Sequence, residues 1–335
     1  AGSLALKDNF ANYDATITKT LRENGAIILG KANLTEFANF MSYNMRNGYS
    51  SLGKEVLCPY NLEEDPSGSS AGSAVSVTLN LSPVSIGTET GGSIMSPSTK
   101  NGVVGIKPTL GFVSRHGIVP IASTLDTAGP IAKNVTDAAI LLSAIRCNDT
   151  NDVITLEKDD KDIDYTKFLD KDGLIGARIG IDTSYLEELP KANKDAFHTN
   201  LKVMEQAGAV IIDNLNIKQT ELIFNVMKYE FKRNINNYLS SLGTNTTMNT
   251  LKDIIQFNRD NDKTCLKYGQ LLLEECENNT SGKMNEVEYF EGIKEREDTI
   301  KVLDESFRIP GGPIHELSQN IIKKAVTYTH LTLPT

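Results

Sequence analysis

Two clusters of serine and glycine carry the residue types from which a nucleophilic site can be built. The first spans residues 67–73 and reads SGSSAGS, and the second spans residues 90–93 and reads TGGS. A serine hydroxyl attacks a carbonyl carbon when a base removes its proton and N–H groups hold the resulting oxyanion. Glycine lets the backbone turn where a Cβ would forbid it, so that successive N–H groups can point to one oxygen. The clusters therefore predict a serine-based acyl-transfer site with oxyanion donors among residues 90–93.

The spacing alone leaves other interpretations of these clusters open. A Gly-Gly-Ser turn also occurs where a strand leads into a helix or where backbone cradles a phosphate, although the chain has no GxxxxGK[ST] motif. Residues 68–72 match GxSxG around Ser70, and His116 is the histidine nearest to the clusters in the sequence. That motif forms a nucleophile elbow after an apolar strand, whereas residues 64–67 (EDPS) read as a loop. A Ser-His-Asp triad at Ser70 is therefore the weaker interpretation.

Composition narrows the class of protein to a globular chain with a substantial core. Of 335 residues, 39% are hydrophobic and 23% are charged, which is enough for one large domain or two ordinary ones. No apolar run approaches the roughly 18 residues of a membrane span, and the net charge of −9 argues against a broad nucleic-acid surface. Four cysteines without a CxxC pair read as reduced structural thiols, and four scattered histidines form no zinc motif. The chain starts without Met or a targeting segment, so its localisation stays open, with the cytoplasm slightly favoured.

Apolar patterns predict the elements that must position the serines. We predict helices over residues 14–24, 34–40, 136–145 and 194–207, and strands over residues 26–29, 103–106, 177–181 and 209–212. The runs 74–81 and 84–87 are apolar enough to be buried, whereas residues 147–172 are rich in Asp and Lys and predict a surface excursion. Residues 220–305 are charged and helical in pattern. The strand–helix–strand order over residues 177–212 predicts an α/β layer architecture, with the later helices on one side of the sheet.

The run from residue 65 to residue 145 closely resembles the amidase signature family of serine amidohydrolases. The ordered matches are SGSSAGS at 67–73, GTETGGSI at 87–94, NGVVGIKPT at 101–109, VSRHGIVP at 113–120 and DTAGP at 126–130. Weaker similarity extends the resemblance over roughly residues 1–305. It implies an α/β amidase-signature fold, with a large mixed β-sheet that helices cover on both faces.

In this family the catalytic unit is Ser–cis-Ser–Lys. The resemblance implies that Ser93 is the nucleophile and that Ser69, joined to Gly68 by a cis peptide bond, relays its proton to a neutral lysine. It also implies a set of oxyanion donors and loop supports, which are Thr90, Gly91 and Gly92 as donors and Ser70 and Gly68 as supports.

The catalytic lysine is the member of this unit that the sequence does not place within the chain. Lys7, in Lys-Asp-Asn, looks like the family's lysine motif, but that motif lies upstream of an Ala-Gly-Ser element, which here opens the chain. Lys107 falls at a predicted strand end and reads as structural. We therefore expect the lysine upstream of Ala1, and little activity from these 335 residues alone. We also expect an amidase domain over residues 1–307 that is truncated at both ends, an unassigned stretch over 308–326, and a cloning or sequencing tail over 327–335.

The implied reaction is hydrolysis of a carboxamide C–N bond, which releases ammonia or an amine and needs neither a metal nor an organic cofactor. The loop over residues 42–53 and the pair Glu89-Thr90 resemble stand-alone amidases, so we expect a small-molecule or peptide amide as substrate, without a nucleic-acid partner. Two other functions remain open. One is the amide-hydrolysing (A) component of a glutamyl-tRNA amidotransferase, which normally has Arg where Met95 stands, and the other is a non-catalytic scaffold with an amidase-like fold. The oligomeric state cannot be read from the sequence.

Overall fold

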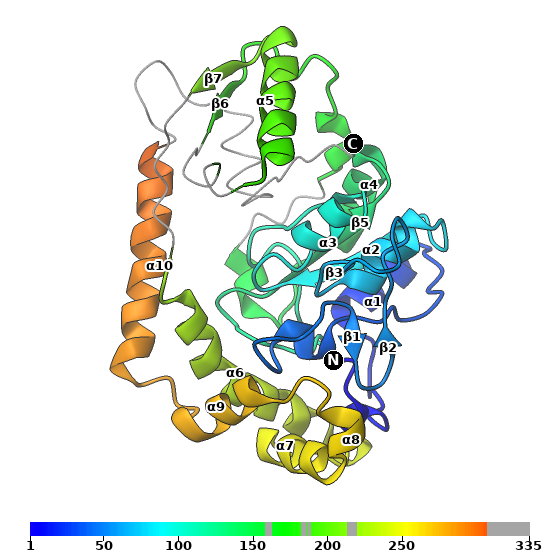
Figure 1. Cartoon of the computed structure of the whole chain (residues 1–335), viewed down its shortest axis with the longest axis vertical. Helices are drawn as coiled ribbons and strands as arrows, with labels where there is room; N and C mark the ends of the chain where they lie inside the picture. The colour runs from blue at the N-terminus through cyan, green and yellow to red at the C-terminus, as the bar shows by residue number, and fades with distance from the viewer. Residues whose placement is uncertain (158–162, 182–185, 187–188, 213–219, 307–335) are drawn as a thin grey trace.

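A computed structural model describes residues 1–157, 163–181, 186, 189–212 and 220–306 (Figure 1). The stretches expected to be unassigned and to be a tail, residues 308–335, lie outside the described residues. Helices and strands are interspersed through the first two thirds of the chain, and the last third is helical. The expected α/β class is confirmed.

An antiparallel sheet of three strands holds the serine clusters. Its order is β3 (Val84–Glu89), β5 (Thr127–Ala132), β4 (Val104–Gly105). The sheet contacts three helices, which are α2 (Ala71–Thr78), α3 (Met95–Lys100) and α4 (Val135–Ile145). Every residue of β5 is buried, and α1 (Thr16–Glu23) packs on α4. Both serine clusters therefore border one buried sheet, because the first leads into α2 and the second joins β3 to α3.

Two further sheets have two strands each. The first pairs β1 (Tyr49–Ser50) with β2 (Lys54–Glu55) in antiparallel orientation. The second pairs β6 (Arg178–Gly180) with β7 (Val210–Ile212) in parallel, and α5 (Lys191–Gln206) connects them. This unit has the strand–helix–strand order predicted for residues 177–212. Among the described residues the strands form these three small sheets, and the large sheet that the resemblance implies is not assembled from them.

A helical region follows the strands, as the charged helical pattern predicts. It contains α6 (Ile223–Ser241), α7 (Leu251–Asp260), α8 (Asp262–Cys265), α9 (Leu271–Asn279) and α10 (Val287–Ser306). Helix α7 begins with a capping box, in which Thr250 and Asp253 bind each other's backbone N–H groups. Phe231 of α6 packs in one core cluster with Phe37 and Phe40, so this region is anchored on the N-terminal part of the chain (Figure 1). None of the helices in the described ranges combines the length and apolar character needed to cross a bilayer.

Two of the predicted elements are wrong. Residues 26–29 form no strand, and Ile27 and Leu29 are 85% and 73% exposed, because this apolar run has no ladder partner among the described residues. The predicted helix over residues 34–40 is a short 3₁₀ segment, η2 (Glu36–Asn39), in which Phe37 and Ala38 have φ values of 48° and 54°. The other 3₁₀ segments are η1 (Leu4–Leu6), η3 (Val153–Glu157), η4 (Tyr165–Phe168) and η5 (Gly243–Asn245).

Candidate active site

The fold brings the two serine clusters together. Ser70 precedes α2 directly, Ser93 lies between β3 and α3, and the Ser70 N–H donates to the Ser93 carbonyl at 3.2 Å. Ser69 is 1% exposed and Ser93 is 8% exposed. The peptide bond between Gly68 and Ser69 is cis, as the resemblance implies. The two serines predicted to act together are therefore neighbours in a buried setting, although they are far apart in the sequence.

The Ser69 hydroxyl is not used by the fold. The Ser69 carbonyl accepts from the Thr35 N–H at 3.0 Å, but the buried Ser69 Oγ has no hydrogen-bond partner among the described residues. Most buried hydroxyl groups in native proteins are hydrogen-bonded, and Ser69 shares its lack of a partner with Ser3, Ser98 and Tyr165. An unpaired hydroxyl beside a second buried serine is thus available to a group that the fold itself does not supply.

The Ser70 side chain joins the first serine cluster to β3. Its Oγ donates to the Thr88 carbonyl at 3.1 Å and accepts from the Thr88 N–H at 3.0 Å, which ties the start of α2 to β3. The His116 ring instead stacks on Tyr13, with 4.7 Å between the ring centroids. The Ser70–His116 pair required by the GxSxG interpretation is therefore not formed.

The loop over residues 90–93 presents backbone N–H groups that the fold leaves free. The Glu89 carboxylate accepts from the N–H groups of Ile94 and Met95 at 2.7 and 3.0 Å. The N–H groups of residues 90–93 make no hydrogen bond to any other described residue. Gly92 has a φ of +81°, a conformation that residues with a Cβ rarely adopt. Four consecutive backbone N–H groups are thus without a partner among the described residues.

Gly68 lies where a side chain has no room. A Cβ at this position would come within 2.6 Å of Thr35 Oγ1 and 2.9 Å of Asn47 Oδ1. Thr35 Oγ1 itself accepts from the Gly48 N–H at 2.8 Å, so it is held in place. The close approach gives a physical reason for glycine before Ser69, and the supporting role of Gly68 stays a prediction.

Neither lysine considered in the sequence hydrogen-bonds to Ser69, because its hydroxyl has no partner among the described residues. Lys7 is exposed at the surface. Burial lowers the pKa of Lys107, and the nearby Glu89 carboxylate opposes that shift. The described residues thus leave the base of the predicted unit unassigned.

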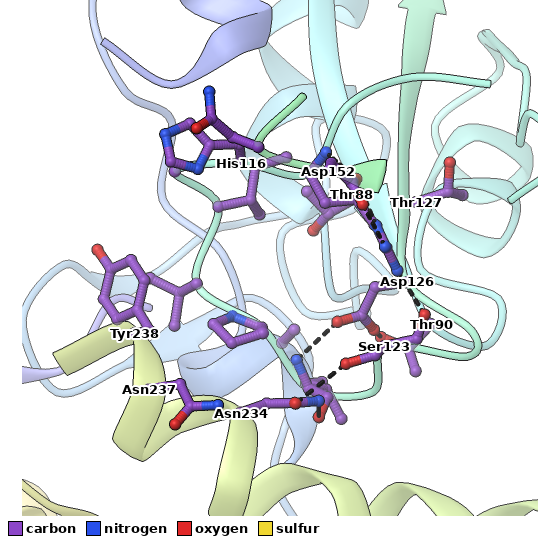
Figure 2. A pocket seen from close by; sticks show the side chains of 18 of the residues that line it. Thr88, Thr90, His116, Ser123, Asp126, Thr127, Asp152, Asn234, Asn237 and Tyr238 are labelled. Carbon is purple, nitrogen blue, oxygen red and sulfur yellow. Dashed lines mark hydrogen bonds and ion pairs between the residues drawn. The ribbon is translucent and has the colours of Figure 1, made fainter. Parts of the chain in front are cut away.

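A pocket of about 330 Å³ opens beside the loop (Figure 2). Its wall includes residues 88–90 at the end of β3, the segment 115–121, and Asn234, Asn237 and Tyr238 of α6. Ser69 and Ser93 are not among the residues that line it. Of the loop over residues 90–93, Thr90 is the residue that lines the pocket.

Asp126 is a residue of this pocket that the sequence did not single out. Thr90 Oγ1 donates to Asp126 Oδ1 at 2.6 Å, and the N–H groups of Ile121 and Ala122 donate to Oδ2 at 2.7 and 2.9 Å. Burial nevertheless raises the pKa of Asp126 to about 6. The DTAGP match at residues 126–130 contains this residue, and that motif is the signal by which it could have been found.

Comparison with known proteins gives a consistent picture. A family model described as amidase matches residues 1–310. A Schizosaccharomyces pombe protein named as an amidase is 40% identical over 279 residues, which are 77% of this chain and 48% of the relative. The native peptide amidase of Stenotrophomonas maltophilia is 39% identical with a TM-score of 0.81, over 89% of this chain and 60% of that structure.

A shorter match involves a component of the glutamyl-tRNA(Gln) amidotransferase of Halothermothrix orenii, its A subunit, which is 42% identical over 200 residues, 59% of this chain and 40% of the relative. The chain spans about half the length of the curated relatives it matches. The family model, the motifs and the fold agree, and the chain belongs to the amidase family.

Proposed function

We propose that the protein hydrolyses the C–N bond of a linear carboxamide by acyl transfer through Ser93. The observation that carries this proposal is the buried Ser69 hydroxyl, which lies beside Ser93 in a cis peptide unit and has no hydrogen-bond partner among the described residues. A proton relay requires such a hydroxyl, because it must exchange partners during the reaction. The free N–H groups of residues 90–93 support the same proposal, because they could bind the carbonyl oxygen as negative charge develops on it.

In the proposed reaction, Ser93 Oγ forms a bond to the carbonyl carbon while its proton passes through Ser69 to a neutral lysine. The N–H groups of residues 90–93 hold the oxyanion. The C–N bond then breaks, and the nitrogen takes up the proton and leaves as ammonia or an amine. A water molecule attacks the ester in the same way and releases a carboxylic acid together with the free serine.

We propose a peptide amide as the substrate class. The support is the 39% identity to the peptide amidase of Stenotrophomonas maltophilia and the resemblance of the loop over residues 42–53 to stand-alone amidases. The match to the amidotransferase component is shorter, and Met95 stands where that component normally has Arg. Hydrolysis without a tRNA substrate is therefore the favoured function.

Ammonia release from C-terminal peptide amides tests the proposal. The complete gene product is assayed beside its Ser93→Ala, Ser69→Ala and Ser76→Ala variants. The Ser76 hydroxyl donates to the Ser73 carbonyl within α2, so Ser76→Ala is a matched loss of a serine hydroxyl outside the site. We expect Ser93→Ala and Ser69→Ala to lower kcat by at least about 10⁴-fold, on the scale seen when a serine nucleophile or its partner is removed. Ser76→Ala should keep the activity, and equal activity in Ser93→Ala would refute the proposal.

A further inference from the structure

The bond between Thr90 and Asp126 joins the free N–H loop to the central sheet. Thr90 follows β3 directly, and Asp126 precedes β5 directly. The last cross-strand pair of the ladder is Glu89 with Thr127, so Thr90 and Asp126 occupy the next position at the same end. A side-chain bond of 2.6 Å thus stands at the point where the backbone ladder stops and the loop begins (Figure 2).

We infer that Asp126 is a positioning residue, which holds Thr90 and thereby sets the direction of the oxyanion-binding N–H groups. The inference rests on the proposed acyl transfer. It assigns a role to a residue that does not touch the reacting atoms, because both carboxylate oxygens are already occupied by Thr90 and by the N–H groups of Ile121 and Ala122.

The carboxylate is held from two sides by elements that do not belong to the loop. Its Oδ2 is bound by two consecutive backbone N–H groups at residues 121 and 122, and the Asp126 N–H itself donates to the Ala122 carbonyl at 2.8 Å. The positive charge of Arg115 lowers the pKa of Asp126, but Arg115 forms its ion pair with Asp152, at 2.6 Å. The Asp126 carboxylate is therefore held in place and can fix the position of Thr90, the first residue of the loop.

The loop needs such a point at Thr90, because the backbone bonds that hold it act at its other end. There the Gly92 carbonyl accepts from the Ser96 N–H at 2.8 Å, and the Ser93 carbonyl accepts from the Ser70 N–H at 3.2 Å. Gly91 and Gly92 contribute no side chain, and a Cβ at Gly91 would meet nothing within 4 Å. Side-chain restraints act only near its two ends among the described contacts, through Thr90 on Asp126 and through Glu89 on the N–H groups of Ile94 and Met95. An oxyanion donor acts when it lies about 2.7–3.1 Å from the developing charge. A displaced Thr90 would move the following N–H groups out of that range.

A purely structural role for Asp126 makes a different prediction. If Asp126 only closes the turn at residues 121–122, the loss of the Thr90 hydroxyl leaves both of those bonds intact and the reaction unaffected. Thr90→Val removes the hydroxyl at nearly constant volume, whereas Thr90→Ser keeps it. Thr16→Val is the matched control, because Thr16 Oγ1 donates to Asp149 Oδ2 at 2.5 Å, away from the loop.

The experiment measures kcat and KM for a peptide amide with the complete gene product and with Thr90→Val, Thr90→Ser, Asp126→Asn, Thr90→Val/Asp126→Asn and Thr16→Val. We expect Thr90→Val to lower kcat about tenfold and Asp126→Asn about ten- to a hundredfold, with KM within about twofold, as for a misplaced transition-state donor. Thr90→Ser should restore wild-type kcat, the double variant should be no slower than Asp126→Asn, and Thr16→Val should keep kcat.

Three results would overturn the inference while leaving the proposed function intact. They are wild-type kcat in Thr90→Val, an equal loss in Thr90→Ser, and losses that multiply in the double variant. Since these comparisons are made relative to an active wild type, they are distinct from failure of the proposed function itself. A wild-type protein that releases no ammonia from any amide would overturn that function and the role of Asp126 with it.

Discussion

Asp126 and Asp149 are two carboxylates with similar partners and opposite electrostatic outcomes. Each accepts from a threonine hydroxyl, which is Thr90 for Asp126 at 2.6 Å and Thr16 for Asp149 at 2.5 Å. Burial raises the pKa of Asp126 to about 6 in spite of its hydrogen bonds. For Asp149 burial also acts upward, but the hydroxyls of Ser114 and Thr16 and the N–H groups of Asn151 lower the pKa to about 2.

The opposite pKa shifts mean that the ionised Asp149 stabilises the folded state, whereas the ionised Asp126 destabilises it. Asp149 gathers two hydroxyls and an asparagine around its ionised form, and it connects α1 to the segments around residues 114 and 151. Asp126 stands in the wall of the pocket, where its partners do not offset the loss of hydration. Perturbed carboxylates of the second kind gather at functional sites. The comparison thus points to Asp126 for function and to Asp149 for stability.

The largest expected effect is a crossover between activity and stability in the two Asp→Asn variants. Asp126→Asn should lower kcat about ten- to a hundredfold, while its free energy of unfolding changes by no more than about 1 kcal/mol, because removing a charge that is costly to bury offsets the lost bonds. Asp149→Asn should keep kcat. It should lower the free energy of unfolding at pH 7 by about 2 kcal/mol, which is the free energy that corresponds to a pKa lowered from 3.8 to about 2.

Urea unfolding and steady-state kinetics on the same preparations measure both quantities. Thr16→Val, which keeps the Asp149 charge, separates the loss of one bond from the loss of the carboxylate. A loss of activity in Asp149→Asn that equals the loss in Asp126→Asn would remove the distinction between the two sites.

The two carboxylates should also give stability opposite dependences on pH. The pKa of Asp126 rises from 3.8 to about 6 on folding. Between these pH values the folded protein keeps a proton that the unfolded chain has released. The contribution of Asp126 to stability therefore falls as the pH rises from about 4 to 6. Asp149 falls from 3.8 to a pKa of about 2, so its contribution is present above about pH 4 and is lost as the pH falls towards 2.

The difference in unfolding free energy between wild type and each Asp→Asn variant, followed from pH 2 to 8, isolates these two contributions. The Asp126 difference should change between about pH 4 and 6 and the Asp149 difference between about pH 4 and 2, in opposite directions along the pH axis. Difference curves that change in the same direction with pH would contradict the opposite pKa shifts of the two carboxylates.

Sequence patterns located the serines and most of the regular elements, because those depend on local chemistry. Helix α4 begins where Asn134 caps it, with the Asn134 side chain accepting from the Asp137 N–H at 2.8 Å, and asparagine is among the residues preferred at a helix N-cap. Residues 26–29 failed as a strand because apolar character signals burial only when another segment is present to cover it. A strand prediction needs the partner as well as the pattern.

The contacts of Asp126 and Asp149 join segments that are far apart in the sequence, so no local sequence pattern predicts them. Thr90 and Asp126 meet because β3 and β5 pair in a register that ends at Glu89 and Thr127, and that register is a property of the folded sheet. The same holds for Asp149, which belongs to a segment expected to lie on the surface but is 8% exposed. Its bonds to Thr16 and Ser114 draw that segment onto the fold.

The most direct test of the central claim is the identity of the residue that a fluorophosphonate probe modifies in the complete gene product. Mass spectrometry of the labelled protein should place the adduct on Ser93, because this serine lies beside the free N–H groups of residues 90–93 and the unpaired Ser69 hydroxyl. Labelling should disappear in Ser93→Ala and persist in Ser76→Ala. An adduct on another residue, or labelling that persists in Ser93→Ala, would contradict the assignment of Ser93 as the nucleophile.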